Sequence, residues 1–242
     1  MTKDIPGKTE CEVSEKVIER LPRYYRQLKR LIDNDIYRIS SGALAELMGL
    51  NPSQIRQDLN CFGGFGQKGY GYNVKYLYTK ISELLGVNDG LSAIIIGAGN
   101  LGKAILRSGV LRSAGVTLVG IFDSDENVIG KSVSGRTVYS AEKLEKFLNE
   151  KRADIAVVST SKYSQAYMPE RLKKFGIKGI WNFTEEELRP VAGVAVKNVR
   201  LEDCLLRLCY EIKTTTGQSD EDISPEGASA ENAVIARQEG DV

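Results

Sequence analysis

Three glycines and one aspartate have the spacing of a turn that binds phosphate and ribose. Gly97, Gly99 and Gly102 follow an apolar run at 93–96 and precede a segment rich in Ala and Leu, so they lie between a predicted buried strand and a predicted helix. The first glycine permits a tight turn, the second lets the backbone approach a pyrophosphate, and the third lets helix and strand pack closely. Asp123 ends the next apolar run, where a carboxylate can bind ribose hydroxyls and repel the extra phosphate of NADP. This pattern predicts an NAD(H) site.

The other candidate cofactor contacts lie in loops at the carboxyl ends of predicted parallel strands, which is where ligands bind in such sheets. We expect the loops at 159–161 and 182–184 to face the nicotinamide. With Asp123, the complete predicted set is Gly97, Ala98, Gly99, Asn100, Leu101, Gly102, Ser159, Thr160, Ser161, Asn182, Phe183 and Thr184. The alternative is a glycine-rich turn in a doubly wound domain that binds no ligand.

A second set of residues has the types that contact nucleic acid. Residues 41–48 and 52–60 predict two short helices, with Ser40 available as a cap, Pro52 at a first helical position and Gly49 in the turn between them. Two short helices joined in this way form a helix-turn-helix, whose second helix reads DNA bases. The predicted exposed face of that helix carries Ser53, Gln54, Arg56, Gln57 and Asn60.

The segments on either side of this pattern extend the predicted DNA-binding surface. The glycine-rich residues 62–72 favour a β-hairpin, or wing, whose tip would bring Lys68 near the DNA backbone. An earlier amphipathic helix has a basic face that includes Arg20 and Arg23. Such a face is usually only solvated, but beside a helix-turn-helix we expect these two arginines to contact phosphates. The alternative is a helical dimerisation or substrate domain with a glycine loop.

The elements that position these residues indicate an α/β protein with two domains. Beyond the glycine turn, strands at 116–122, 155–159 and 180–183 alternate with helices, which predicts a Rossmann doubly wound parallel sheet. The apolar helix at 201–212 has more hydrophobic surface than one face needs, so we expect it to pack on a second subunit. The predicted ranges are a disordered leader at 1–13, a winged-helix domain at 14–86, a Rossmann domain at 91–200, a dimerisation helix at 201–213 and a disordered tail at 214–242.

Composition excludes several classes of protein. The chain of 242 residues is 42% hydrophobic and 27% charged, as is usual for a globular protein, and it has no apolar run long enough to span a membrane and no signal-peptide core. We therefore expect a cytoplasmic protein. The four cysteines have neither zinc-site nor disulfide-framework spacing, so no metal site is predicted. There is no histidine to act as a general base. Tyr76 and Lys80 have the Tyr-x-x-x-Lys spacing of short-chain reductases, but they precede the glycine turn instead of following it. Both observations argue against an NAD-dependent enzyme.

Several motifs, in the right order over residues 14–212, resemble the Rex family of redox-sensing transcriptional repressors. The motifs are Arg20-Leu-Pro-Arg-Tyr-Tyr-Arg26, Arg38-Ile-Ser-Ser41, Gln54-Ile-Arg-Gln-Asp-Leu59, Phe62-Gly-Gly-Phe-Gly66, Gly69-Tyr-Gly-Tyr72, Gly97-Ala-Gly-Asn-Leu-Gly102, Gly176-Ile-Lys-Gly179 and Asn182-Phe183. The resemblance implies a homodimer with an exchanged C-terminal helix that binds an AT-rich inverted repeat in double-stranded DNA. It also implies that NADH closes the dimer and releases DNA, while NAD⁺ leaves DNA binding intact and no bond in the cofactor is broken.

The sequence departs from the family pattern near the expected switch. Ser108 replaces a usual Tyr and Arg200 a usual Asp, so a family contact that also involves the arginine at 26 cannot form in the same way. Ser159 and Thr160 replace Val-Pro, Glu185 replaces a proline near the nicotinamide, and Gln57 replaces a lysine in the recognition helix. The alternative function is therefore a Rex-like paralogue with a weak or lost NADH response, or a constitutive DNA-binding scaffold.

Overall fold

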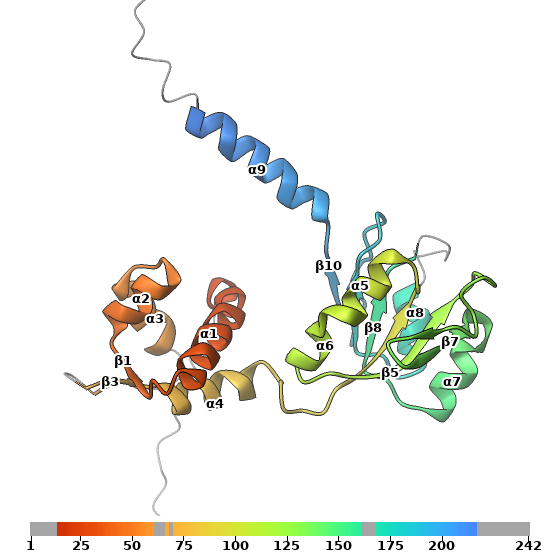
Figure 1. Ribbon diagram of the computed structural model, residues 1–242, viewed down its shortest axis with the longest axis horizontal. Helices are drawn as coiled ribbons and strands as arrows, with labels where there is room; N and C mark the ends of the chain where they lie inside the picture. Colours follow the sequence, from red (N-terminus) through yellow and green to blue (C-terminus); the bar gives the residue numbers. More distant parts are fainter. Residues whose placement is uncertain (1–13, 61–65, 68–69, 161–167, 217–242) are drawn as a thin grey trace, which may run out of the picture.

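The computed structural model describes residues 14–60, 66–67, 70–160 and 168–216. Figure 1 shows two bodies in this part of the chain, a group of N-terminal helices with a small sheet and a larger parallel sheet flanked by helices. The predicted leader at 1–13, and nearly all of the tail predicted from residue 214, lie outside the described residues. The α/β class and the order of the two domains agree with the sequence analysis.

The long helix α1 (Glu15–Asp33) forms one side of the N-terminal core. Its buried residues recur at helical spacing, and Pro22 lies within the helix without ending it. They pack with buried side chains of α2 (Ser41–Met48), α3 (Pro52–Asn60) and α4 (Val74–Leu84), including Leu44, Ile55 and Leu77. This shared core fixes the orientation of the two short helices.

The helix-turn-helix forms where the sequence predicts it, between α2 and α3. The Ser40 hydroxyl accepts a hydrogen bond from the Ala43 amide at 3.0 Å and caps α2, and Gly49 ends α2 with a φ of 62°. The side-chain oxygen of Asn51 accepts from the Ser53 amide at 2.8 Å, just before α3. Local capping therefore sets both ends of the turn.

The predicted wing is a small antiparallel sheet of order β1-β3-β2, formed by β1 (Arg38–Ile39), β2 (Gly66–Gln67) and β3 (Gly71–Asn73). Gly71 has a φ of 70°, and a Cβ there would lie 2.6 Å from the Ile39 carbonyl oxygen, so only glycine fits between the strands. Lys68, at the predicted tip, lies outside the described residues. The Asn73 side chain then caps α4 by accepting from the Tyr76 amide at 3.0 Å.

A buried carboxylate joins α3 to α1. Asp58 is fully buried, and it accepts hydrogen bonds from Arg20 Nε at 2.7 Å and Nη2 at 2.8 Å. Tyr24 Oη donates to it at 2.8 Å, and Gln54 Nε2 donates at 2.7 Å. Three side chains from two helices therefore satisfy one charge and hold the recognition helix in place.

The second domain is a seven-stranded sheet of order β10-β9-β8-β4-β5-β7-β6. Every pair of neighbours is parallel except β6 and β7. The neighbours on either side of β4 are β5 and β8, so the strand order reverses at β4, which is the ligand-binding position in doubly wound sheets. The strands are β4 (Ser92–Ile96), β5 (Thr117–Asp123), β6 (Ser132–Val133), β7 (Arg136–Ser140), β8 (Ile155–Val158), β9 (Gly179–Asn182) and β10 (Ala195–Asn198).

Alternate residues of β4 face two separate hydrophobic cores. Ile94 and Ile96 belong to a core with α7 (Leu144–Glu150) and α8 (Met168–Lys173). Ala93 and Ile95 belong to another, with α5 (Asn100–Ser108) and α6 (Val110–Ser113). A strand that is buried on both faces has a continuous run of apolar residues, and this run allows β4 to be predicted from the sequence.

The β6–β7 hairpin is absent from the sequence-based prediction, which has only a turn after β5. Ser134 and Gly135 both have positive φ, 50° and 77°, as the two central residues of a type I′ hairpin turn do. In β7 only Val138 is buried, so the strand lacks the apolar run that marks β4 and β8. The turn dipeptide is the signal that would have revealed this hairpin.

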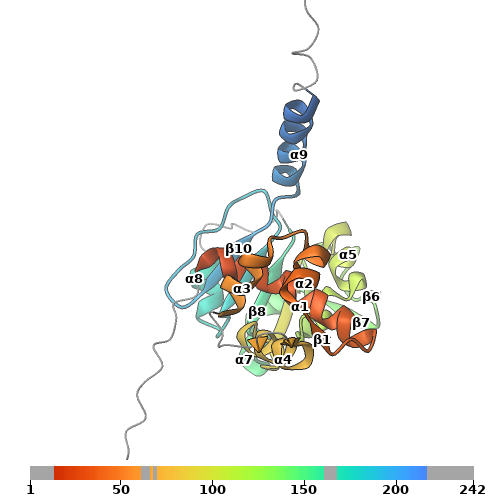
Figure 2. The ribbon, with the colours of Figure 1, turned by 90° about the vertical axis from the view of Figure 1, so that its left-hand side faces the viewer.

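The C-terminal helix α9 (Leu201–Thr216) projects away from the rest of the chain in both views (Figures 1 and 2). Its large apolar side chains are between 50% and 68% exposed. The helix runs three residues past the predicted boundary at 213, and the hydroxyls of Thr214 and Thr215 hydrogen-bond to carbonyls one turn earlier. Within the described residues, none of the helices is long and apolar enough to cross a membrane.

Asp58→Asn is predicted to destabilise the N-terminal domain by about 3 kcal/mol near neutral pH, the lower end of the range for breaking a buried ion pair, because Arg20 remains 21% exposed. Burial alone would raise the pKa of Asp58, but hydrogen bonds from Arg20, Gln54 and Tyr24 outweigh this and hold it below the ordinary 3.8. A carboxyl with a lowered pKa stabilises the fold above its ordinary pKa, and that contribution is lost as the pH falls through the folded-state pKa.

The measurement is denaturant unfolding followed by circular dichroism across a pH series. The difference in free energy of unfolding between the native protein and Asp58→Asn should be largest at neutral pH and shrink below pH 3.8. Asp33→Asn is the matched control, since Asp33 makes only an exposed ion pair with Lys29, and it should change stability little at any pH. A pH-independent difference for Asp58→Asn would show that its charge is not the stabilising feature.

Candidate dinucleotide site and nucleic-acid interface

The glycine turn joins β4 to α5 at a close backbone contact. Gly97 has a φ of 105°, and a Cβ there would lie 2.8 Å from the Ser159 carbonyl carbon. A Cβ at Gly102 would collide with the Gly97 carbonyl oxygen and lie 2.9 Å from Ser159 Oγ. The structure therefore requires glycine at both positions, for the tight turn and for helix–strand packing as the sequence predicts.

The protein's own packing does not require glycine at position 99. Gly99 is the N-cap of α5, and a Cβ there would have no protein atom within 4 Å among the described residues. A side chain at 99 would thus extend into the space in front of the helix, where the first-turn N–H groups and the positive end of the helix dipole favour an anion. Glycine leaves this space open, as the predicted pyrophosphate site needs.

Asp123 lies at the carboxyl end of β5, directly beside the turn. Its Oδ2 accepts a hydrogen bond from the Ala98 amide at 2.6 Å, and its Oδ1 accepts from the Asp125 amide at 2.9 Å. Two backbone donors therefore fix the orientation of a half-buried carboxylate. Because a carboxylate has about four acceptor positions, it retains capacity for ribose hydroxyls. The turn, the helix N-terminus and the acid are brought together as an NAD(H) site needs.

The loop after β8 supports the turn from below. Ser159 Oγ donates a hydrogen bond to the Gly97 carbonyl at 3.0 Å. The sequence predicts that this residue faces the nicotinamide, but its hydroxyl is hydrogen-bonded to the glycine turn. Thr160 follows and is partly exposed, and Ser161 lies outside the described residues. Asn100 is exposed at the start of α5, and Leu101 packs partly against the core beneath it.

The side chains of Asn182 and Thr184 are buried and bonded within the protein. Asn182 Nδ2 donates to the Glu186 carbonyl and to Asn198 Oδ1, both at 2.8 Å, and its Oδ1 accepts from Thr184 Oγ1 at 2.8 Å. They shape the loop, and a direct side-chain contact with the nicotinamide stays a prediction. Asn198 is the in-register neighbour of Asn182 on β10. It is not predicted as a site residue, because only the pairing of β9 with β10 in the structure brings it beside Asn182.

Aromatic side chains flank this loop. Phe183 is half-buried and packs on Trp181, with ring centroids 4.6 Å apart. Both belong to the same core cluster as Ala98 and Leu101 at the glycine turn. The loop that is predicted to lie near the nicotinamide and the glycine turn therefore pack on the same hydrophobic core.

The departures from the family pattern lie around this region. Ser108 Oγ donates back to the Ile105 carbonyl of its own helix at 2.7 Å, so the hydroxyl is used within α5. Glu185 and Arg200 are exposed. Each of these side chains is thus at the surface or bonded locally, and the described residues show no contact that replaces the family one.

The recognition helix α3 presents one oriented cation. Arg56 is exposed, and its Nη1 donates to Ser41 Oγ at 3.2 Å and its Nη2 to Ser53 Oγ at 2.8 Å. Both partners are neutral, so they orient the guanidinium without cancelling its charge. Gln57 and Asn60 are exposed on the same helix. Arg56 is therefore held by hydroxyls of both helices of the motif, and its contact with DNA stays a prediction.

Three other residues predicted to contact DNA are bonded inside the domain. Arg20 and Gln54 bind the buried Asp58, and Arg23 Nη2 donates to the Met48 carbonyl at the end of α2 at 2.7 Å. Arg20 therefore joins α1 to α3, Arg23 joins α1 to α2, and Gln54 bonds within α3. Contact of these side chains with DNA stays a prediction. The sequence analysis missed Asp58 because an acidic residue in a DNA-reading helix has no obvious role until its partners are seen.

The chain matches known proteins over both domains. Residues 12–60 match the family model described as "Putative DNA-binding protein N-terminus", and residues 88–186 match the one described as "CoA binding domain". The curated redox-sensing transcriptional repressor Rex of Caldanaerobacter subterraneus subsp. tengcongensis is 46% identical over 200 residues, which cover 83% of this chain and 89% of the relative.

Solved structures of RSP, described as a Rex-family repressor, are also similar. RSP in complex with β-NAD⁺ and operator DNA has a TM-score of 0.77 and 42% identity, covering 87% of this chain and 99% of RSP. RSP in complex with β-NADH has a TM-score of 0.76 and 40% identity, covering 86% and 98%. This chain therefore resembles these relatives in both sequence and structure over most of their length. The chain therefore belongs to the Rex family of redox-sensing transcriptional repressors.

Proposed function

We propose that this protein is a cytoplasmic, homodimeric repressor that binds an AT-rich inverted repeat through its winged-helix domain and senses NADH/NAD⁺ through its Rossmann domain. NADH weakens operator binding. The observation that carries the proposal is the Asp123 carboxylate held against the open glycine turn by the Ala98 amide, in a chain whose other domain presents a helix-turn-helix. RSP, its relative, is solved with β-NAD⁺, β-NADH and operator DNA.

The nucleotide acts as an effector and not as a reactant. The helix N-terminus at Gly99 would hold the pyrophosphate, and Asp123 would hold the adenosine ribose. The chain contains no histidine to act as a general base, in keeping with a binding role. An effector shifts an equilibrium only by its different affinity for the two states, so NADH must bind the DNA-releasing state more tightly than the DNA-bound state.

The homodimer is supported by α9. Its side chains at 201, 205, 206, 208, 210 and 212 are large, apolar and at least half exposed in one copy of the chain. Exposed apolar surface of this extent marks an interaction site. Two copies exchanging this helix would bury it and would place two recognition helices on an inverted repeat.

The alternative, a paralogue with a weak or lost NADH response, rests on Ser108, Arg200, Ser159, Thr160 and Glu185. It predicts operator binding that neither nucleotide changes. Ser159 and Thr160 lie in the loop beside the glycine turn, and Glu185 follows the loop expected near the nicotinamide, so these substitutions bear on nucleotide preference as well as on coupling between the domains. Nucleotide binding and DNA release must accordingly be measured separately.

Arg56→Ala is expected to weaken operator binding about tenfold or more, because loss of a base-contacting or phosphate-contacting arginine costs about 1–3 kcal/mol. The measurement is operator affinity across a salt series, where loss of a phosphate contact also lowers the salt slope by about one. Arg189→Ala removes an equal charge from the exposed surface of the Rossmann domain and is the matched control. Unchanged affinity for Arg56→Ala would remove this residue from the interface.

Asp123→Ala is expected to weaken NADH binding about ten- to a hundredfold, because charge-assisted hydrogen bonds to the ribose hydroxyls are lost. Calorimetry of NADH and NADPH binding tests this, and the native protein should prefer NADH while the variant loses that preference. Glu126→Gln changes an exposed acid in the following turn and should bind both nucleotides as the native protein does. Native-like NADH affinity in Asp123→Ala would contradict the proposed site.

A further inference from the structure

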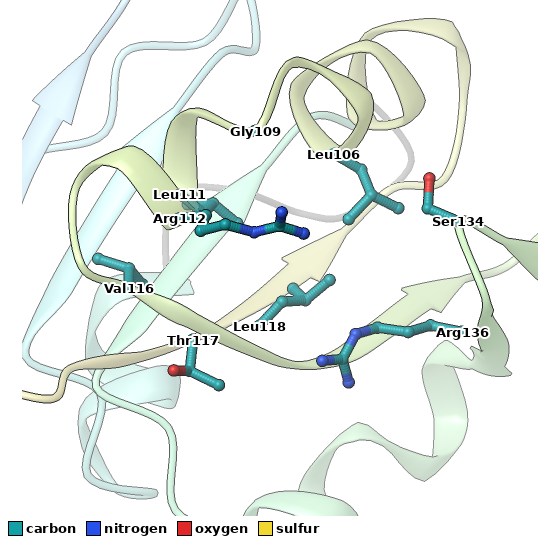
Figure 3. Close-up of a pocket in the computed structure, with 9 residues that line it drawn as sticks. All are labelled: Leu106, Gly109, Leu111, Arg112, Val116, Thr117, Leu118, Ser134 and Arg136. Carbon is teal, nitrogen blue, oxygen red and sulfur yellow. The ribbon is translucent and has the colours of Figure 1, made fainter.

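A cavity of about 240 Å³ lies in the Rossmann domain, away from the glycine turn. It is open on one side to solvent and is lined by the junction of α5 and α6, the first residues of β5 and the β6–β7 hairpin (Figure 3). Thr117 and Leu118 line it at the start of β5, whereas Asp123 is the last residue of that strand. Six residues of strand span about 20 Å, so the cavity and the nucleotide site are at opposite ends of the sheet.

Two arginines converge on this cavity from different elements. Figure 3 shows Arg112, from α6, and Arg136, from β7, extending toward the same space with Leu118 between them. None of the described lining residues is acidic, and neither guanidinium forms an ion pair within the part of the chain that the structure describes. Like charges held close together repel, and an anion between them would relieve that repulsion. The guanidinium fork also matches carboxylate and phosphate oxygens.

The rest of the cavity selects for a small molecule with an apolar part. Leu111 and Leu118 are buried beneath it, Leu106 is partly buried, and the Ser134 hydroxyl lies at its edge. Its volume is below the range of about 300–1,000 Å³ that is usual for drug-sized ligands. A second dinucleotide is therefore too large, and a short carbon skeleton with one or two anionic groups fits.

The hairpin makes this arrangement specific. The Ser134–Gly135 turn has positive φ at both residues, which fixes the direction in which β7 begins and so the position of Arg136. On the other side, Gly109 joins α5 to α6 with a φ of 72° and turns the chain so that Arg112 reaches the same space. Two tight turns thus position the two cations.

We propose that this cavity is a second ligand site, which binds a small organic anion, a carboxylate or phosphate ester on a short carbon skeleton, between Arg112 and Arg136. The site is separate from the nucleotide site, and its ligand does not compete with NAD⁺ or NADH.

The test is calorimetric titration of the full-length protein with succinate and, separately, with glycerol 3-phosphate. Saturating NAD⁺ is present, so that the dinucleotide site is filled and cannot take up the anion. Succinamide, which has the shape of succinate without its charge, is the ligand control. We expect saturable binding of succinate or of glycerol 3-phosphate and no binding of succinamide. The anion that binds with the higher affinity shows whether the site prefers a carboxylate or a phosphate.

Two protein variants decide where the anion binds. Arg112→Gln and Arg136→Gln should each weaken anion binding by at least about tenfold, because each removes charge-assisted hydrogen bonds. The double variant Lys174→Gln/Arg189→Gln removes two exposed charges elsewhere in the domain and should bind the anion as the native protein does. NAD⁺ affinity should be native-like in all of them, which reports folding and the proposed sensor independently. The proposal would be overturned if neither anion bound the native protein, or if Arg112→Gln and Arg136→Gln bound the anion as tightly as the native protein does.

Discussion

The Rossmann domain depends on one close contact, that of Gly102 in α5 with the carbonyl of Gly97 at the end of β4. No Cβ fits in this contact, and Ser159, in the loop after β8, hydrogen-bonds to the same carbonyl. Because the helix is held so near the strand, the turn that leads into its N-terminus lies beside the Asp123 carboxylate, which accepts a hydrogen bond from the Ala98 amide. The same packing therefore sets the stability of the sheet and the geometry of the nucleotide site.

The N-terminal domain uses charge differently at its surface and in its core. Arg20 and Arg56 are both arginines near the helix-turn-helix, yet Arg20 is neutralised by the buried Asp58, whereas Arg56 donates to two hydroxyls and has no acidic partner among the residues that the structure describes. The first holds the recognition helix and the second remains a cation for an external anion. The fold thus fixes the position of the side chain that is proposed to contact DNA.

The sequence is sufficient to predict the glycine turn, the helix-turn-helix and the parallel sheet, because each is a local pattern of glycine, caps and apolar runs. It is not sufficient where a role depends on a distant partner. Asp58 and Asn198 act through contacts with residues on other elements, and Arg20 looks like a surface cation until Asp58 is seen beside it. The β6–β7 hairpin escaped prediction because only Val138 of β7 is buried.

The central claim is that occupation of the Rossmann domain by NADH changes DNA binding by the other domain. Its most direct test is fluorescence anisotropy of a labelled AT-rich inverted repeat bound to the full-length protein at fixed salt, titrated separately with NADH and with NAD⁺. The account predicts that NADH releases the DNA and that NAD⁺ leaves it bound. If neither nucleotide changes the anisotropy while calorimetry shows that both bind, the two domains are uncoupled and the proposed redox sensing is contradicted.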